Sequence, residues 1–178
     1  MSTLRILAIV LAIAAPGCAP NPVAQSPGLG RVATQDEIRA WDLSVLPDGA
    51  GLPPGGGTAA TGATVYELRC QRCHGAKGAG RPNDQLVGGQ GSLATKTPVR
   101  TIGSYWPYAT TVFDYVRRAM PYDAPKSLTD NEVYAVTAYL LSLNGIIGAG
   151  EEMNARTLPA VAMPNRDGFV LMYPLKPR

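Results

Sequence analysis

The chain has 178 residues and a formal net charge of only +3, and its basic residues are scattered along the sequence. This pattern does not indicate a nucleic-acid partner, because binding to a phosphate backbone needs a concentrated basic surface. The 20 glycines and 16 prolines are clustered, and they leave one segment, from about Thr58 to Ile147, that is suited to a compact domain. A domain of this size often needs a covalent or metal staple.

Residues 1–18 have the pattern of an export signal. Arg5 provides a positive charge, and the apolar run 6–15 has the length of a signal-peptide core and is short for a membrane span. The sequence APGC, which ends at Cys18, is similar to the cleavage site of bacterial lipoproteins. Two alternatives therefore stay open: a lipid anchor at Cys18, or an export signal without a lipid. Under both, we expect the domain to be periplasmic.

Residues 19–57 are predicted to form a flexible N-terminal arm. Gly, Pro, Ala, Ser and Thr dominate the stretches 16–30 and 47–62, and this composition is typical of connecting segments. Between these stretches, the sequence TQDEIRAWD (Thr34–Asp42) predicts a short helix that is capped at its N-terminus. We interpret this helix as a docking arm.

Cys70, Cys73 and His74 stand together in the sequence YELRCQRCHGAKG, and His74 is the chain's only histidine. The spacing C-x-x-C-H is typical of covalent c-type haem attachment. One helical turn separates the two thiols, so both can form thioether bonds at one edge of the porphyrin, and the next residue can place an imidazole under the iron. Because the motif occurs once, we expect one haem c.

Other uses of these three side chains fit the sequence less well. A structural zinc site has four ligands as a rule, and the remaining cysteine, Cys18, lies in the export signal. A redox-active dithiol is expected in a βαβ context, and the sequence shows no such alternation. A structural disulfide between Cys70 and Cys73 would be strained at this short spacing.

Two helices are predicted in the stretch 59–120. The first runs from Ala59 to His74, with Tyr66 and Leu68 on either side of its inner face. The second covers the stretch 110–120, TTVFDYVRRAM, in which apolar side chains recur at helical spacing.

A third helix is predicted at 131–144 and is expected to pack against the first. Thr129 is its expected N-cap, with Glu132 as the capping-box partner, and Gly145 provides a stop signal. Its apolar residues share one face: Val133, Val136, Leu140, Leu141 and Leu143.

With one histidine in the chain, the sixth position of the iron needs another group: a methionine, a lysine, water or a partner's side chain. Met120 ends the second predicted helix, and Pro121 prevents that helix from continuing. A thioether in this loop can reach the open face of the haem, and Met/His is an established ligand pair of electron carriers. We favour Met120; Met163, which also precedes a proline, is the main rival.

Several other residues have two interpretations. Arg117 and Arg118 either neutralise haem propionates or form a solvated face. Trp106 either lines the haem or packs in the core. The Gly-rich stretch 82–93 lacks the spacing of a phosphate loop, and we expect it to bring backbone close to the porphyrin.

Together, these features resemble class I cytochromes c. The segment Ile102–Ile147 is more narrowly similar to the cytochrome subunits of the sulfane (sulfite) dehydrogenase of the bacterial Sox system, as are LVGGQGSL and TLPAVAMPNRDGF. The similarity extends roughly over Thr34–Phe169. It implies an all-α fold of three to five helices around one covalently bound haem, with a cytochrome c domain at 58–148 and an extended C-terminal tail at 149–178.

The resemblance also implies a function. Such a cytochrome is a periplasmic subunit that takes electrons singly from a molybdenum-cofactor subunit, which oxidises sulfane sulfur or sulfite, and passes them to a downstream cytochrome or oxidase. Cys70 and Cys73 would attach the haem, His74 would be the proximal ligand and Met120 the distal ligand. Larger members carry a second haem domain, for which this chain has no second motif.

Two other functions stay open. The chain would be a free periplasmic shuttle to a terminal oxidase if it had no dedicated dehydrogenase. It would be a haem enzyme in its own right if the sixth position of the iron were open to a substrate.

Overall fold

The computed structural model describes residues 28–170 and 172, so the predicted export signal and Cys18 lie outside the described residues. Five α-helices account for most of its regular structure: α1 (Gln35–Trp41), α2 (Ala59–Arg69), α3 (Gln71–His74), α4 (Ala109–Ala119) and α5 (Asp130–Leu143). Two short strands, β1 (Gly56–Thr58) and β2 (Glu152–Asn154), and 3₁₀ turns at Ala76–Gly78 and Leu158–Ala160 complete it. The all-α prediction is confirmed. None of the described helices is long and apolar enough to cross a membrane.

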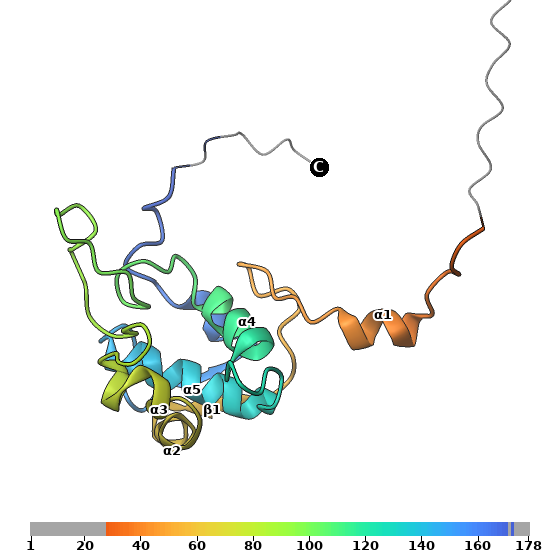
Figure 1. Cartoon of the computed structure of the whole chain (residues 1–178), viewed down its shortest axis with the longest axis horizontal. Coiled ribbons are helices and arrows are strands. Elements are labelled where there is room, and N and C mark those ends of the chain that lie inside the picture. The colour runs from red at the N-terminus through yellow and green to blue at the C-terminus, as the bar shows by residue number, and fades with distance from the viewer. Residues whose placement is uncertain (1–27, 171, 173–178) are drawn as a thin grey trace, which may run out of the picture.

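Helix α5 is the centre of the domain. It packs against α2 on one side and α4 on the other, and Figure 1 shows α5 between these two helices, with α1 apart from them. The predicted face of Val133, Val136, Leu140 and Leu141 is buried, whereas Leu143 is half-buried. Tyr134, Ala135, Thr137 and Ala138 are buried as well, because α5 is covered from two sides rather than one.

The start of α5 is built as the sequence predicts. Thr129 is the N-cap, and the capping box with Glu132 is present, with the Glu132 carboxylate accepting hydrogen bonds from the Thr129 N–H at 2.7 Å and its hydroxyl at 2.8 Å. The box satisfies backbone donors that the first turn of a helix leaves without partners. These hydrogen bonds to the ionised form hold the pKa of Glu132 below its ordinary value of 4.5.

This pKa predicts how the stability of the fold depends on pH. A carboxyl with a lowered folded-state pKa stabilises the fold above its unfolded-state pKa, and the stabilisation is lost as the pH falls through the folded-state value. The melting temperature of the wild type, measured relative to that of Glu132→Gln, should therefore fall below about pH 4.5. Thermal melts of both proteins between pH 3 and 7 measure this difference, and a difference that stays constant over the range would contradict the assignment.

The first predicted helix is broken at the haem motif. Helix α2 ends at Arg69, and Cys70 has φ −120° and ψ −38° between α2 and α3, so the expected continuous helix from Ala59 to His74 is wrong. Tyr66 is fully buried as predicted, but Leu68 is 76% exposed. Residues that are two positions apart on a helix are separated by about 200° around its axis, so the side chains of Tyr66 and Leu68 point in nearly opposite directions. Gly62, four positions before Tyr66, shares its buried face.

Helices α2 and α5 approach each other closely at Gly62. A Cβ atom added there would lie 1.9 Å from the carbonyl oxygen of Ala135 and 2.8 Å from Cβ of Tyr139. The contact is extended by Tyr66 and Tyr139, whose ring centroids are 5.4 Å apart. The absence of a side chain at Gly62 is thus what allows the two helices to pack at this distance.

The second helix and the N-terminal helix agree with their predictions. Helix α4 begins one residue before the predicted stretch and ends at Ala119, with Met120 as its C-cap; Val112, Phe113 and Val116 are buried. Helix α1 begins after Thr34, which caps it through a capping box with Glu37.

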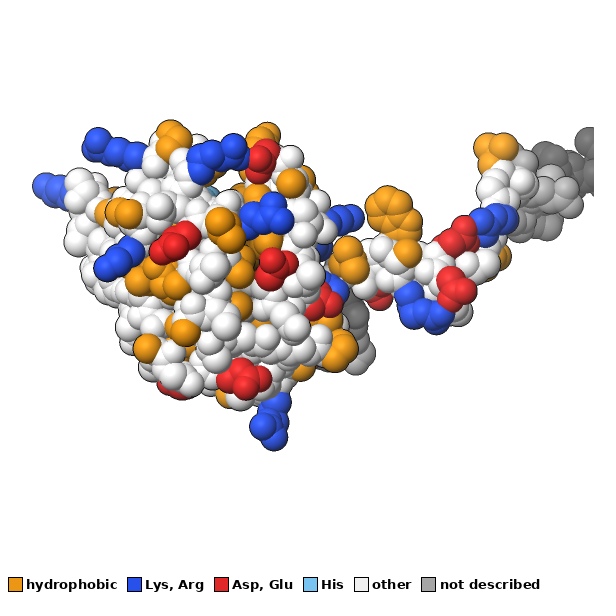
Figure 2. Space-filling model, turned by 90° about the horizontal axis from the view of Figure 1, so that it is seen from below, with side chains coloured by type: hydrophobic (Ala, Val, Ile, Leu, Met, Phe, Trp, Pro, Cys, Tyr) orange, Lys and Arg blue, Asp and Glu red, His pale blue; other side chains and the backbone are white. Residues whose placement is uncertain are grey.

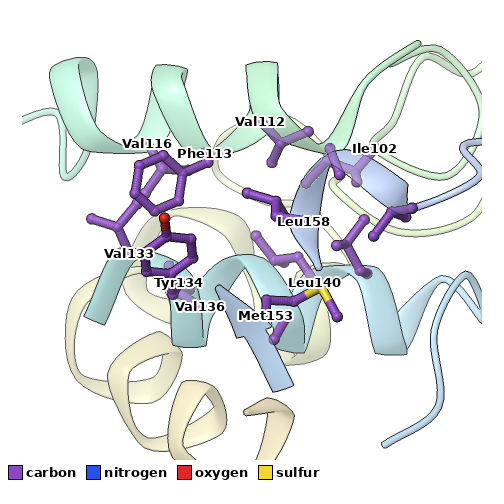
Figure 3. Packing of buried hydrophobic residues seen from close by; sticks show 14 of the residues in the cluster. Ile102, Val112, Phe113, Val116, Val133, Tyr134, Val136, Leu140, Met153 and Leu158 are labelled. Carbon is purple, nitrogen blue, oxygen red and sulfur yellow. The ribbon is translucent and has the colours of Figure 1, made fainter. Parts of the chain in front are cut away.

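The segment after α5 differs from the expected extended tail. Strand β2 pairs with β1 in an antiparallel two-stranded sheet that the sequence did not predict. Met153, Leu158, Val161 and Met163 belong to the buried core, and Figure 3 shows Met153 and Leu158 among side chains of α4 and α5. The sequence did not predict this burial, because the segment contributes isolated apolar side chains to a core formed by other elements. Such side chains have no helical periodicity.

Candidate functional site

A cavity of about 480 Å³ opens beside the α2–α3 junction, within the range of about 300–1,000 Å³ that cofactor sites occupy. Its walls come from α3, from α4 and the loop that follows it, from α5, and from the loops at 82–86 and 100–106. The four residues singled out in the sequence all line it: Cys70, Cys73, His74 and Met120. Segments far apart in the chain therefore meet at one site.

The inner wall of the cavity is apolar. Val112 and Val116 of α4 and Val136 and Leu140 of α5 line it, and Figure 3 shows the side chains of α4 directed toward α5. Ile102 completes this part of the wall. A lining of this kind keeps water out and favours a large planar apolar group over a polar ligand.

The two cysteines are half-buried free thiols. Burial, with a smaller effect of the neighbouring Cys73, raises the pKa of the Cys70 thiol to about 11. Cys70 is therefore protonated at neutral pH and lacks the lowered pKa of a reactive dithiol. Within residues 28–170 and 172, no group of three or more His, Cys, Asp or Glu side chains is assembled as a metal-ion site. The raised pKa of Cys70 argues against the dithiol interpretation.

His74 is oriented by the loop that follows it. Its Nδ1 lies 2.8 Å from the carbonyl oxygen of Asp84, and because a carbonyl only accepts, Nδ1 is the protonated nitrogen. Nε2 is then the nitrogen with a free lone pair for a metal, in the arrangement common among metal-binding histidines. Two backbone hydrogen bonds hold this loop in place, from Gly80 N–H to His74 O at 2.7 Å and from Asn83 N–H to Cys73 O at 2.9 Å.

The methionines differ in where they lie. Met120 is half-buried, lines the cavity, and closes α4 with a hydrogen bond from its N–H to Val116 O at 3.1 Å. Met163, the rival candidate, is only 3% exposed, belongs to the hydrophobic core and does not line the cavity. Met153 is buried in the same core, and Met172 is exposed. Among the methionines of the described residues, Met120 alone shares the cavity with His74.

The arginines that line the cavity are not Arg117 and Arg118, for which the sequence left two interpretations open. Arg117 pairs with Asp130 at 2.9 Å, and Arg118 forms two hydrogen bonds to Asp114; neither arginine lines the cavity. Two arginines that sequence reasoning missed line it instead.

These two are Arg69 and Arg100. The position of Arg69 directly before Cys70 was a signal that could have been used, whereas Arg100 is brought to the site only by the fold. Trp106 also lines the cavity, with its ring centroid 5.7 Å from that of Tyr115, and it packs against the core at the same time.

The Gly-rich stretch reaches the cavity through its first part only. Residues 82–86 line the wall, whereas Gly88, Gly89 and Gly91 do not, so the part of the stretch that reaches the cavity precedes its glycines. Asn144, at the end of α5, holds the stretch in place: its side chain accepts a hydrogen bond from Gly88 N–H at 2.9 Å and donates one to Leu86 O at 3.2 Å.

Comparisons with known proteins agree with this geometry. The family model of cytochrome c matches residues 59–144. A chain of the crystal structure of the sulfane dehydrogenase SoxCD from Paracoccus pantotrophus is 45% identical, with a TM-score of 0.78, over 82% of this chain and 72% of that chain. None of the curated protein sequences compared gives a match. The resemblance to class I c-type cytochromes and their fold is thereby confirmed, and the chain belongs to the cytochrome c family, whose members are electron carriers with covalently bound haem.

Proposed function

We propose that this cytochrome c carries one haem, accepts electrons from the molybdenum-cofactor subunit of a sulfane or sulfite dehydrogenase, and passes them to the respiratory chain. The observation that carries the proposal is the single cavity lined by Cys70, Cys73, His74 and Met120, in a chain 45% identical to one from the sulfane dehydrogenase SoxCD.

The residues of the cavity fit haem c. Cys70 and Cys73 offer two thiols for thioether bonds, His74 offers Nε2 to the iron, and Met120 offers a thioether for the sixth position. When bound, haem supplies a one-electron iron couple. The sulfur of Met120 favours the reduced state, and the apolar wall limits access of water to the site. Arg69 and Arg100 are the cavity's candidates for pairing with propionate carboxylates.

The chain's own part in the reaction is then to hold, orient and insulate the haem. No general acid or base is required of it, because oxidation of the sulfur compound belongs to the dehydrogenase subunit. We place the protein in the periplasm, either with a lipid anchor at Cys18 as its direct link to a membrane or, if the export signal carries no lipid, without that anchor. The receiver of its electrons is a downstream cytochrome or oxidase.

Two measurements on the mature protein test this proposal. Acid–acetone should leave the haem attached to the wild type and extract all of it from a Cys70→Ala, Cys73→Ala double variant, since thioether bonds resist extraction. The wild type should also form a one-to-one complex with the molybdenum-cofactor protein encoded in the same genome, and sulfite or protein-bound sulfane sulfur should reduce the haem within that complex.

The alternatives give different results in these measurements, in the near-infrared absorption of the ferric protein and in the binding of small ligands. A free shuttle would be reduced by other donors and form no stable complex. A haem enzyme with an open sixth position would lack the weak near-infrared absorption of a sulfur–iron bond and would bind small ligands directly. Extraction of the haem from the wild type would reject covalent attachment at Cys70 and Cys73.

A further inference from the structure

Helix α1 carries apolar side chains that the domain does not cover. None of its residues is buried by the described part of the chain. Ile38 and Trp41 are three positions apart and so lie on one face of the helix, and Trp41 is 80% exposed. Figure 2 shows the segment that carries α1 standing apart from the globular part, with hydrophobic side chains at its surface. An exposed tryptophan beside an aliphatic side chain is typical of a protein–protein contact.

Helix α1 is formed by local interactions. Thr34 and Glu37 make the capping box, Arg31 donates hydrogen bonds to Glu37, and Arg39 pairs with Asp36. A helix of seven residues is marginal in water without such support. The face of Ile38 and Trp41 is therefore preformed, which lowers the entropy lost when it binds.

Three side chains of α4 attach the following segment, 43–47, to the domain. Asp114 accepts a hydrogen bond from Val45 N–H at 2.9 Å, Thr110 donates one to Pro47 O at 3.0 Å, and Arg117 donates one to Leu43 O at 3.3 Å. Val45 itself is buried in the core. This attachment joins the segment that follows α1 to α4, the helix that ends at Met120 and lines the cavity.

The apolar face of α1 meets the loop that follows α4. The ammonium group of Lys126 lies 5.3 Å from the centre of the Trp41 ring, a cation–π contact with the loop 121–128. In the same loop, Tyr122 lines the cavity and is 83% exposed. Ile38, Trp41 and Tyr122, which we call the docking surface, thus connect the arm to the opening through which electrons would enter.

We propose that the docking surface binds an apolar groove of the molybdenum-cofactor dehydrogenase subunit and places the cavity mouth against it; this rests on the proposed function. The cytochrome c family model covers less than half of this chain, whereas the match to the SoxCD chain covers 82%. The similarity therefore includes flanking segments that a cytochrome domain by itself does not require. Helix α1 carries Asp36 and Glu37 against the single Arg39, which is opposite to the basic face of helices that bind anionic membranes.

The test uses the full-length, haem-loaded protein and the dehydrogenase with which the wild type forms its complex. An Ile38→Ser, Trp41→Ser double variant should raise the Kd of that complex at least 30-fold, measured by titration calorimetry. Tyr122→Ser should raise the Kd about tenfold and slow reduction of the haem. Leu68→Ser is the matched control. Leu68 lies on α2 and is 76% exposed, close to the 80% of Trp41, and its replacement should leave the Kd within about twofold. The haem spectrum and melting temperature of the double variant should be unchanged, because α1 buries no residue.

Each other outcome overturns the proposal. If the double variant binds as tightly as the wild type, the docking surface is wrong while the proposed function stands. If the wild type itself forms no complex, both are wrong. A wild-type dimer in sedimentation that the double variant loses, with the Kd for the dehydrogenase unchanged, would assign the surface to a second copy of the chain. Loss of binding to phosphatidylglycerol vesicles, again with that Kd unchanged, would assign it to a membrane.

Discussion

Replacing Met120 by leucine is expected to abolish the near-infrared sulfur-to-iron absorption of the ferric protein and to lower its reduction potential. Leucine keeps nearly the volume of methionine, so the change removes the thioether at a packing cost of less than about 1.5 kcal/mol. Axial ligation sets haem potentials over about 0.8 V, and we expect a decrease on the order of 0.1 V or more. Absorption spectroscopy and a redox titration measure the two effects.

Met163→Leu is the matched control for this variant. Met163 is buried in the core and does not line the cavity, so the absorption band and the potential should be retained. Met163→Ala should also retain the band, while the cavity it leaves should destabilise the fold by about 2–5 kcal/mol. Loss of the band on replacing Met163, with the band retained on replacing Met120, would reverse the ligand assignment.

Replacing Gly62 by alanine is expected to destabilise the domain although alanine is the better helix former. The exchange gains about 0.8–1 kcal/mol in helix propensity. Against this gain, the new Cβ would lie 1.9 Å from the carbonyl oxygen of Ala135, so α2 and α5 would have to move apart. Overpacking of this kind costs about 1–3 kcal/mol and more where backbone is met, so the net change should be a loss of about 2 kcal/mol.

Thermal or denaturant unfolding of the haem-loaded protein measures this loss. Thr64→Ala, on the exposed side of the same helix, is the control, and its stability should change by no more than about 0.5 kcal/mol. A Gly62→Ala variant as stable as the wild type would mean that the helices do not meet at Gly62 as described.

Much of the site could be predicted because its signals are local. Cys70, Cys73 and His74 fall within five positions, and the order of two thiols followed by an imidazole is typical of covalent haem attachment. The capping boxes at Thr34 and Thr129 likewise link residues three positions apart, and both are present. Met120 was found because Pro121 ends a helix there, again a neighbouring residue.

The errors at Cys70 and Leu68 are local, whereas the role of the arginines depends on contacts between distant segments. The break at Cys70 was missed because α2 and α3 follow each other directly and no glycine or proline marks the junction in the sequence. Leu68 was assigned to the inner face without regard to the helical angle that separates it from Tyr66. The sequence left two roles open for Arg117 and Arg118, and only the structure shows that they pair with Asp130 and Asp114 and do not line the cavity.

The amino-acid sequence by itself determined the haem motif, the helix caps and the candidate thioether, because each depends on covalent spacing or on one turn of helix. Only the tertiary structure decided that Met153 and Met163 belong to the core, that Arg69 and Arg100 face the cavity, and that Trp41 meets Lys126. These relations come from contacts between distant segments, α5 against α2 and α4 and the N-terminal arm against α4, and such contacts leave no periodic signal in the chain.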